Sequence, residues 1–124
     1  MAEDRVAAKF AVCPSGALAN GQYRKLALVF EGREEECLLL RFDGQVYAYL
    51  NRCVHMPRRL DGEVAEIFDE TGRYLRCSMH GIVYTPQSGT SVSAMCEGEQ
   101  LRAVTVYEED GTVGLADFRV SACR

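Results

Sequence analysis

The chain contains two histidines, and each lies a short distance after a cysteine. His55 comes two residues after Cys53, and His80 comes three residues after Cys77. Thiolate and neutral imidazole are both metal ligands, and each segment supplies one of each. The two pairs therefore predict a single metal site, and any fold of this chain must bring the two segments together.

The six cysteines leave a second interpretation open, a disulfide framework. The first residues, Met1 to Arg5, carry acids and no apolar stretch, so we expect no secretion signal and a cytoplasmic location. Disulfides are rare there, which favours metal ligands or free buried thiols. We expect the other four cysteines not to be ligands, and Cys123 to be exposed: Cys13, Cys37, Cys96 and Cys123.

Length and composition narrow the class of protein. The chain has 124 residues, 48% hydrophobic residues and a net charge of −4. We therefore expect one soluble domain over residues 1–124. No apolar run is long enough to span a membrane, and no basic stretch suggests a nucleic-acid partner.

Short apolar runs separated by turn residues indicate an all-β fold. The turn signals are Asp43 with Gly44, residues 109–111, residues 68–72 and residues 86–89. No long segment shows helical periodicity. The main predicted strands are residues 6–12, 24–30, 36–42, 45–51, 101–108 and 112–118.

The two cysteine–histidine segments, CVH from Cys53 to His55 and CSMHG from Cys77 to Gly81, resemble the two halves of the Rieske motif. The resemblance implies one [2Fe–2S] cluster, with the two thiolates on one iron and the imidazoles of His55 and His80 on the other. It also implies stacked antiparallel β-sheets, as a sandwich or small barrel. In that fold a cluster-binding subdomain, at about residues 51–90, is inserted in a β base.

Other positions differ from the Rieske pattern or match it in part. Arg58 and Met79 stand where respiratory members carry two disulfide-forming cysteines, and Ile82 replaces a serine that donates a hydrogen bond to a bridging sulfide. Fewer donors predict a potential low in the Rieske range, which is about −150 to +300 mV. Tyr84 has the opposite effect, because it matches a tyrosine that donates to a ligand sulfur in high-potential members.

The resemblance implies one-electron transfer rather than catalysis. A small ferredoxin between a reductase and a terminal oxidoreductase is the expected role. A small subunit bound permanently to an oxidoreductase is the alternative. Buried thiols beside surface histidines, or a structural zinc site, also remain open, although the split order of cysteine and histidine fits zinc poorly.

Overall fold

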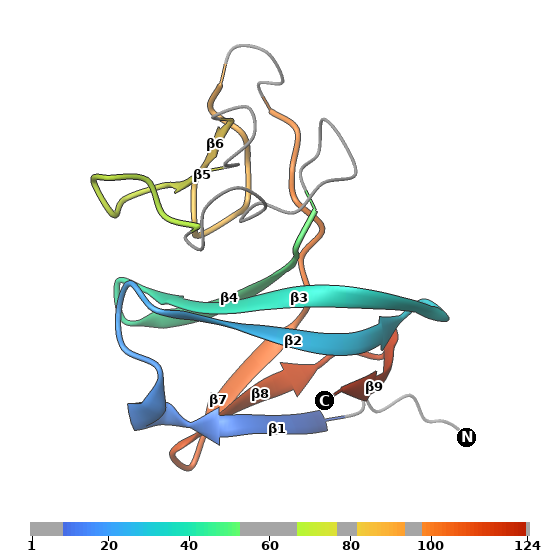
Figure 1. The fold of residues 1–124 in the computed structure, drawn as a ribbon. Helices are drawn as coiled ribbons and strands as arrows, with labels where there is room; N and C mark the ends of the chain where they lie inside the picture. Colours follow the sequence, from blue (N-terminus) through green and yellow to red (C-terminus); the bar gives the residue numbers. More distant parts are fainter. Residues whose placement is uncertain (1–8, 53–66, 77–81, 94–97, 124) are drawn as a thin grey trace. The chain divides into compact units, whose positions relative to one another are not determined.

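The computed structural model describes residues 9–52, 67–76, 82–93 and 98–123. The chain divides into two compact units, Met1–Ala48 with Val104–Arg124, and Tyr49–Ala103. The second unit is thus inserted in the sequence between the two parts of the first (Figure 1). The assignment of residues 1–124 to one domain, with a subdomain at about 51–90, stays a prediction.

Nearly all regular structure in the described residues is β, which confirms the predicted fold class. The larger sheets have the strand orders β1-β8-β7 and β4-β3-β2-β9, and a third sheet pairs β5 with β6 (Figure 1). Every strand pair whose register is given is antiparallel. Among the described residues, no helix has the length and apolar character needed to cross a membrane. The elements are β1 (Lys9–Pro14), η1 (Ser15–Ala17), β2 (Tyr23–Phe30), β3 (Arg33–Phe42), β4 (Gln45–Leu50), β5 (Leu75–Arg76), β6 (Val83–Tyr84), β7 (Val106–Glu109), β8 (Thr112–Ala116) and β9 (Val120–Cys123).

Three tight turns connect neighbouring strands of the first unit. In the predicted turn between β3 and β4, Asp43 and Gly44 have φ values of 52° and 85°. The turn between β7 and β8, at Asp110 and Gly111, has the same pair of positive φ angles, at 52° and 75°. Two successive positive φ angles match the right-handed twist of a hairpin, and glycine adopts them at little cost. Both predicted hairpins are confirmed, and Glu31 with Gly32 makes a third that was not predicted.

Most predicted strands differ from the observed ones by a few residues at an end, and two differences are larger. Residues 101–108 were expected to form one strand, but β7 begins only at Val106, and Ala103 forms an isolated bridge with Tyr49. The strand β9 was not predicted, yet it pairs with β2. Alternation of apolar residues is a weak indicator for segments this short, since partners distant in sequence decide whether the segment pairs.

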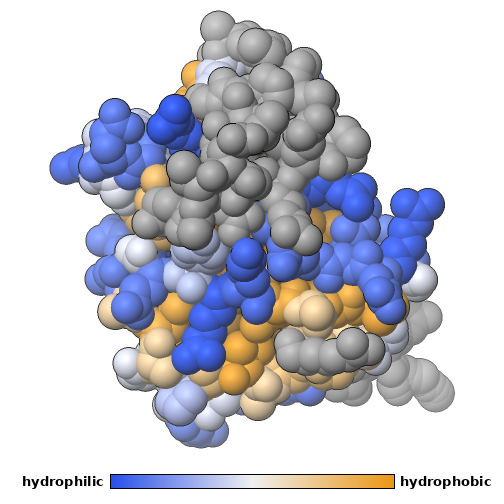
Figure 2. Space-filling view, in the orientation of Figure 1, coloured by the Kyte–Doolittle hydropathy of each residue, from blue (hydrophilic) through white to orange (hydrophobic). Residues whose placement is uncertain are grey.

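The core of the first unit centres on β3. Its residues from Cys37 to Leu40 are all 0% exposed. Successive side chains of a strand point to opposite faces, so β3 is covered on both faces. Each leucine buried in this way contributes about 2 kcal/mol to folding. On the face shown in Figure 2, polar side chains surround an area of the first unit where apolar side chains reach the surface.

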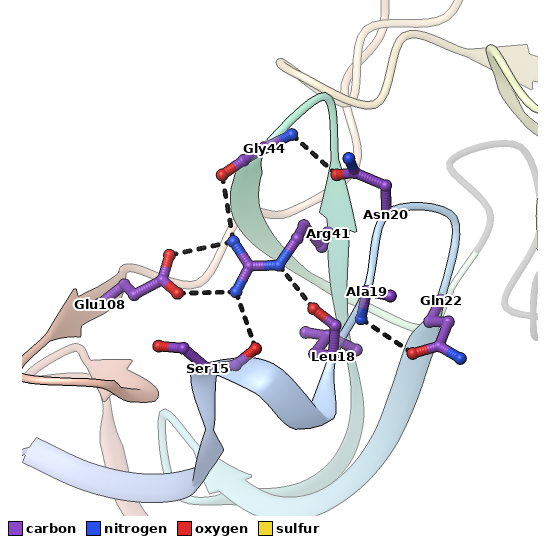
Figure 3. A network of polar contacts seen from close by, with 8 residues as sticks. All are labelled: Ser15, Leu18, Ala19, Asn20, Gln22, Arg41, Gly44 and Glu108. Atoms are coloured by element: carbon purple, nitrogen blue, oxygen red, sulfur yellow. Dashed lines mark hydrogen bonds and ion pairs between the residues drawn. The ribbon is translucent and has the colours of Figure 1, made fainter.

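One arginine joins three elements of the first unit (Figure 3). The Arg41 guanidinium, at the end of β3, donates to the carbonyl oxygens of Leu18 at 2.6 Å, Gly44 at 3.0 Å and Ser15 at 3.3 Å. It also binds both carboxylate oxygens of Glu108 in β7, at 3.1 and 2.6 Å. The Arg41 side chain is 12% exposed, so these bonds are largely shielded from water.

A buried carboxylate anchors the other end of this unit. Asp117 is 2% exposed and accepts hydrogen bonds from the backbone N–H groups of Thr105 and Arg119, both at 2.9 Å. The Arg119 guanidinium donates to it at 2.9 and 2.7 Å and lies over the Phe30 ring. Burial alone would raise the pKa of Asp117, but these donors outweigh it and lower the pKa to about 2.

Candidate metal centre

The predicted ligands lie outside the residues that the structure describes: Cys53, His55, Cys77 and His80. Arg58, Met79 and Cys96 lie outside them as well. The structure does describe the residues that lead into and out of the two ligand segments. These flanking residues belong to the second unit. They show how the chain holds the ends of each segment.

The first ligand segment follows directly on a backbone held by hydrogen bonds. The Leu50 N–H, at the end of β4, donates to the Arg102 carbonyl at 2.9 Å, and the Arg52 N–H donates to the Leu50 carbonyl at 2.8 Å. Asn51 is buried, with 6% of its surface exposed. Arg52 immediately precedes Cys53, so the chain is fixed up to the residue before the first predicted ligand.

The second ligand segment begins and ends on two paired strands. Leu75 of β5 lies opposite Tyr84 of β6, and Arg76 lies opposite Val83. Opposite residues of an antiparallel pair are about 5 Å apart, so both ends of the connecting residues 77–82 are held close together. Cys77 is the first residue after β5. The predicted second pair therefore lies in the connection between two paired strands.

Two serines fix the chain beside β6. The Val83 N–H donates to the Ser93 hydroxyl at 2.9 Å, and the Val92 N–H donates to the Val83 carbonyl at 2.9 Å. The Ser93 N–H in turn donates to the hydroxyl of Ser91, which is 1% exposed. The sequence interpretation missed both serines, because nothing local distinguishes them from other polar loop residues.

A buried tyrosine connects the two ligand-bearing parts of the unit. The Tyr49 hydroxyl donates to the Pro86 carbonyl at 2.7 Å. Tyr49 lies in β4, before the first ligand segment, and Pro86 follows the second. The residues that flank the two predicted pairs are thus joined directly by a side-chain hydrogen bond.

Exposed arginines flank both predicted pairs. Arg52 directly precedes Cys53 and Arg76 directly precedes Cys77, and both arginines are exposed. A positive charge beside a cysteine favours the thiolate form, which is the form that binds metal.

The donor set fits a mixed thiolate–imidazole cluster. Two cysteines and two histidines supply the ligands that a Rieske-type cluster requires. Across residues 9–52, 67–76, 82–93 and 98–123, no group of three or more histidine, cysteine, aspartate or glutamate residues could hold a metal ion. The described part of the chain therefore offers no competing metal site.

Three of the remaining cysteines are described, and all are free thiols. Cys13 and Cys37 are buried in strands of the first unit. The expectation that Cys123 is exposed was wrong, because it lies half-buried in β9 opposite Leu28. Burial raises the pKa of its thiol. Such burial is typical of thiols that serve as packing residues, and the expectation that these three are not ligands stays a prediction.

Comparisons with known proteins agree with the fold. A family model of the Rieske [2Fe-2S] domain matches residues 8–113. A carbazole-bound complex of the oxygenase and ferredoxin of carbazole 1,9a-dioxygenase contains a chain that is 25% identical, with a TM-score of 0.69. The match covers 87% of this chain and 28% of that one. No curated protein matches the chain.

Two further solved structures share the fold. The ferredoxin of carbazole 1,9a-dioxygenase from Nocardioides aromaticivorans IC177 is 22% identical, with a TM-score of 0.66, and the match covers 88% of this chain and 97% of the ferredoxin. The terminal oxygenase of carbazole 1,9a-dioxygenase from Novosphingobium sp. KA1 is 25% identical, with a TM-score of 0.68, over 86% of this chain and 29% of the oxygenase chain. This chain thus spans less than a third of the larger chains that it matches. Because the family model covers most of the sequence, the chain belongs to the Rieske [2Fe-2S] domain family and binds one [2Fe–2S] cluster.

Proposed function

We propose that this chain transfers single electrons through a cluster held by Cys53, His55, Cys77 and His80. The observation that carries the proposal is that both cysteine–histidine pairs fall within residues 8–113, the span of the Rieske match. When bound, a cluster of this type accepts and releases one electron at a time. In the family's arrangement the two thiolates bind one iron and the two imidazoles bind the other.

The surrounding residues support this role in three ways. Arg52 and Arg76 place an exposed positive charge directly before each predicted cysteine ligand in the sequence. The β5–β6 pair holds both ends of the second segment. Ile82, which is 1% exposed and directly follows the HG of the motif, excludes water from this part of the unit.

The role that these features favour is that of a small ferredoxin, an electron carrier rather than an enzyme. The similarity extends over 97% of the ferredoxin of carbazole dioxygenase, which supports a carrier role. Both histidines are assigned to the cluster, so none is left to act as a general base. We propose a reductase as the electron donor and a terminal oxygenase as the acceptor.

A permanent subunit of an oxidoreductase is the second candidate. It is favoured by the matches in which this chain covers only 28% or 29% of a larger chain, since a Rieske domain there is one part of a longer protein. Purification from the native cells distinguishes the two roles. A stoichiometric complex that survives gel filtration indicates a subunit, whereas a free chain that binds partners only transiently indicates a ferredoxin.

We also propose a cytoplasmic location. The three described cysteines outside the predicted ligands, Cys13, Cys37 and Cys123, are free thiols. Free thiols are typical of a reducing compartment.

The test of the proposed function is metal and sulfide analysis of the purified chain, together with electron paramagnetic resonance of the dithionite-reduced protein. We expect about two irons and two sulfides per chain and a rhombic signal of low average g. Zinc without sulfide and without a signal would instead establish a structural metal site.

Ligand variants then test the assignment of the four residues. Cys53→Ala and His80→Ala should lose the rhombic signal, and Cys123→Ala, which removes a cysteine outside the ligand set, should keep it. His80→Cys retains four ligand side chains and should lower the potential, because all-cysteine clusters lie near about −400 mV. An unchanged signal and potential in both His80 variants would exclude His80 as a ligand.

A further inference from the structure

Tyr49 makes two contacts in the second unit that reach across the sequence. The residue is 2% exposed, and its hydroxyl donates to the Pro86 carbonyl at 2.7 Å. The edge of the Tyr49 ring lies against Gly89, where a Cβ atom built on the glycine would come within 2.7 Å of the ring carbon Cε1. A real Cβ cannot approach a ring this closely, so the tyrosine and the glycine form a matched pair.

The loop that receives Tyr49 is held in place by its own hydrogen bonds. The Gly89 N–H donates to the Thr85 carbonyl at 2.7 Å, and the Thr85 N–H donates to the Thr90 carbonyl at 2.9 Å. The Ser88 hydroxyl bonds to the hydroxyls of Thr85 at 2.6 Å and Thr90 at 2.9 Å. Gly89 has a φ of 70°, a conformation that glycine adopts without strain. The Pro86 carbonyl is thus presented by a well-supported loop.

The two partners of this contact lie outside the ligand segments in the sequence, one before the first segment and one after the second. Tyr49 precedes Cys53 by four residues, and Pro86 follows His80 by six. Gly89 is also held by Leu101, whose N–H donates to the Gly89 carbonyl at 2.9 Å. A metal site built from two segments requires a fixed separation between them, and side chains that lock their flanks provide it.

We propose that Tyr49 is a positioning residue for the cluster: its hydroxyl and its ring hold the flanks of the two ligand segments at the spacing that the cluster requires. This inference rests on the proposed ligand set, in which one cysteine and one histidine come from each segment. It assigns Tyr49 a role in cluster retention and electronic structure beyond that of a buried core residue.

The experiment compares Tyr49→Phe with Tyr47→Phe in the cluster-loaded protein. Tyr47 lies two residues away on the same strand, is half-buried and loses the same hydroxyl. We measure the rate at which a chelator bleaches the visible absorbance, the resonance spectrum of the reduced protein and the melting temperature. Tyr49→Phe should lose its cluster about fivefold faster than Tyr47→Phe, the factor that one typical hydrogen bond contributes to an equilibrium. Its resonance lines should also broaden.

Two results would overturn the proposal. The first is that Tyr49→Phe has the same bleaching rate and the same resonance spectrum as Tyr47→Phe. The second is that its melting temperature falls while the bleaching rate and the spectrum stay unchanged, which would make Tyr49 purely structural. If wild type and Tyr47→Phe both show the rhombic signal, such a result removes only the role of Tyr49. A wild-type protein without iron, sulfide or signal would instead refute the proposed function.

A second pair of variants tests the ring contact separately. Gly89→Ala should accelerate cluster loss in the presence of Tyr49, and Tyr49→Leu should relieve part of that effect by removing the ring that the new methyl group meets. Strictly additive effects of the two substitutions would mean that the ring and the glycine are independent, and would overturn this part of the inference.

Discussion

Replacing Arg41 with methionine should destabilise the first unit strongly while leaving the cluster signal unchanged. Methionine keeps an aliphatic side chain of similar reach but removes every donor of the guanidinium. Three backbone carbonyls and the Glu108 carboxylate then lose their shared partner (Figure 3). These groups come from η1 and the turn after it, the β3–β4 turn and β7, so one substitution loosens three connections.

The magnitude follows from the geometry of the contacts. The bonds to Leu18 at 2.6 Å and Gly44 at 3.0 Å are short, and each contributes about 1 kcal/mol. The bond to Ser15, at 3.3 Å, contributes less. The two-point ion pair with Glu108, whose side chain is 30% exposed, adds about 1 kcal/mol. The expected loss is therefore about 3 kcal/mol, or a melting temperature lower by about 10 °C for a chain of this length.

The pH dependence of the stability provides a second test of the Arg41→Met prediction. Hydrogen bonding to Arg41 lowers the pKa of Glu108, so the pair stabilises the fold above the ordinary glutamate pKa. That contribution is lost as the pH falls through the lowered pKa of Glu108. The difference in stability between wild type and Arg41→Met should therefore narrow in acid.

The assay is far-UV circular dichroism of the cluster-loaded protein, heated at one fixed rate, because the midpoint of an irreversible transition depends on the heating rate. Arg24→Met serves as the control, since Arg24 is an exposed arginine of β2 in the same unit. A melting temperature of Arg41→Met within about 2 °C of that control would refute the argument.

Two further predictions concern other buried groups. Asp117, with its pKa lowered to about 2, contributes about 2 kcal/mol that is present above the ordinary aspartate pKa and lost as the pH falls through about 2. Asp117→Asn should therefore melt lower than wild type at pH 7, and the gap should close on acidification; a gap independent of pH would show that the carboxylate charge has no role. Tyr84→Phe should lower the reduction potential by about 40 mV, the equivalent of one hydrogen bond of about 1 kcal/mol to a ligand sulfur. Tyr84 is fully buried and lies opposite Leu75, two residues before Cys77. Protein-film voltammetry measures the shift, and an unchanged potential would rule out the donor.

Local sequence indicated the cluster chemistry and two of the three tight turns of the first unit. The spacings from Cys53 to His55 and from Cys77 to His80 indicated the cluster, because ligand type and short spacing are properties of a few adjacent residues. Asp43 with Gly44, and the turn at Gly111, indicated hairpins for the same reason, since the φ angles of a turn depend on its own residues.

The tertiary structure alone decided which distant groups meet. Arg41 binds Leu18, 23 residues away, and Glu108, 67 residues away. Tyr49 reaches Pro86 across 37 residues, and β9 pairs with β2 from the other end of the chain. Nothing near any of these residues in the sequence encodes the partner, because such contacts depend on how the packed sheets bring remote segments together. The sequence thus indicated which residues to propose as ligands, whereas packing across long sequence separations decided which distant groups flank them.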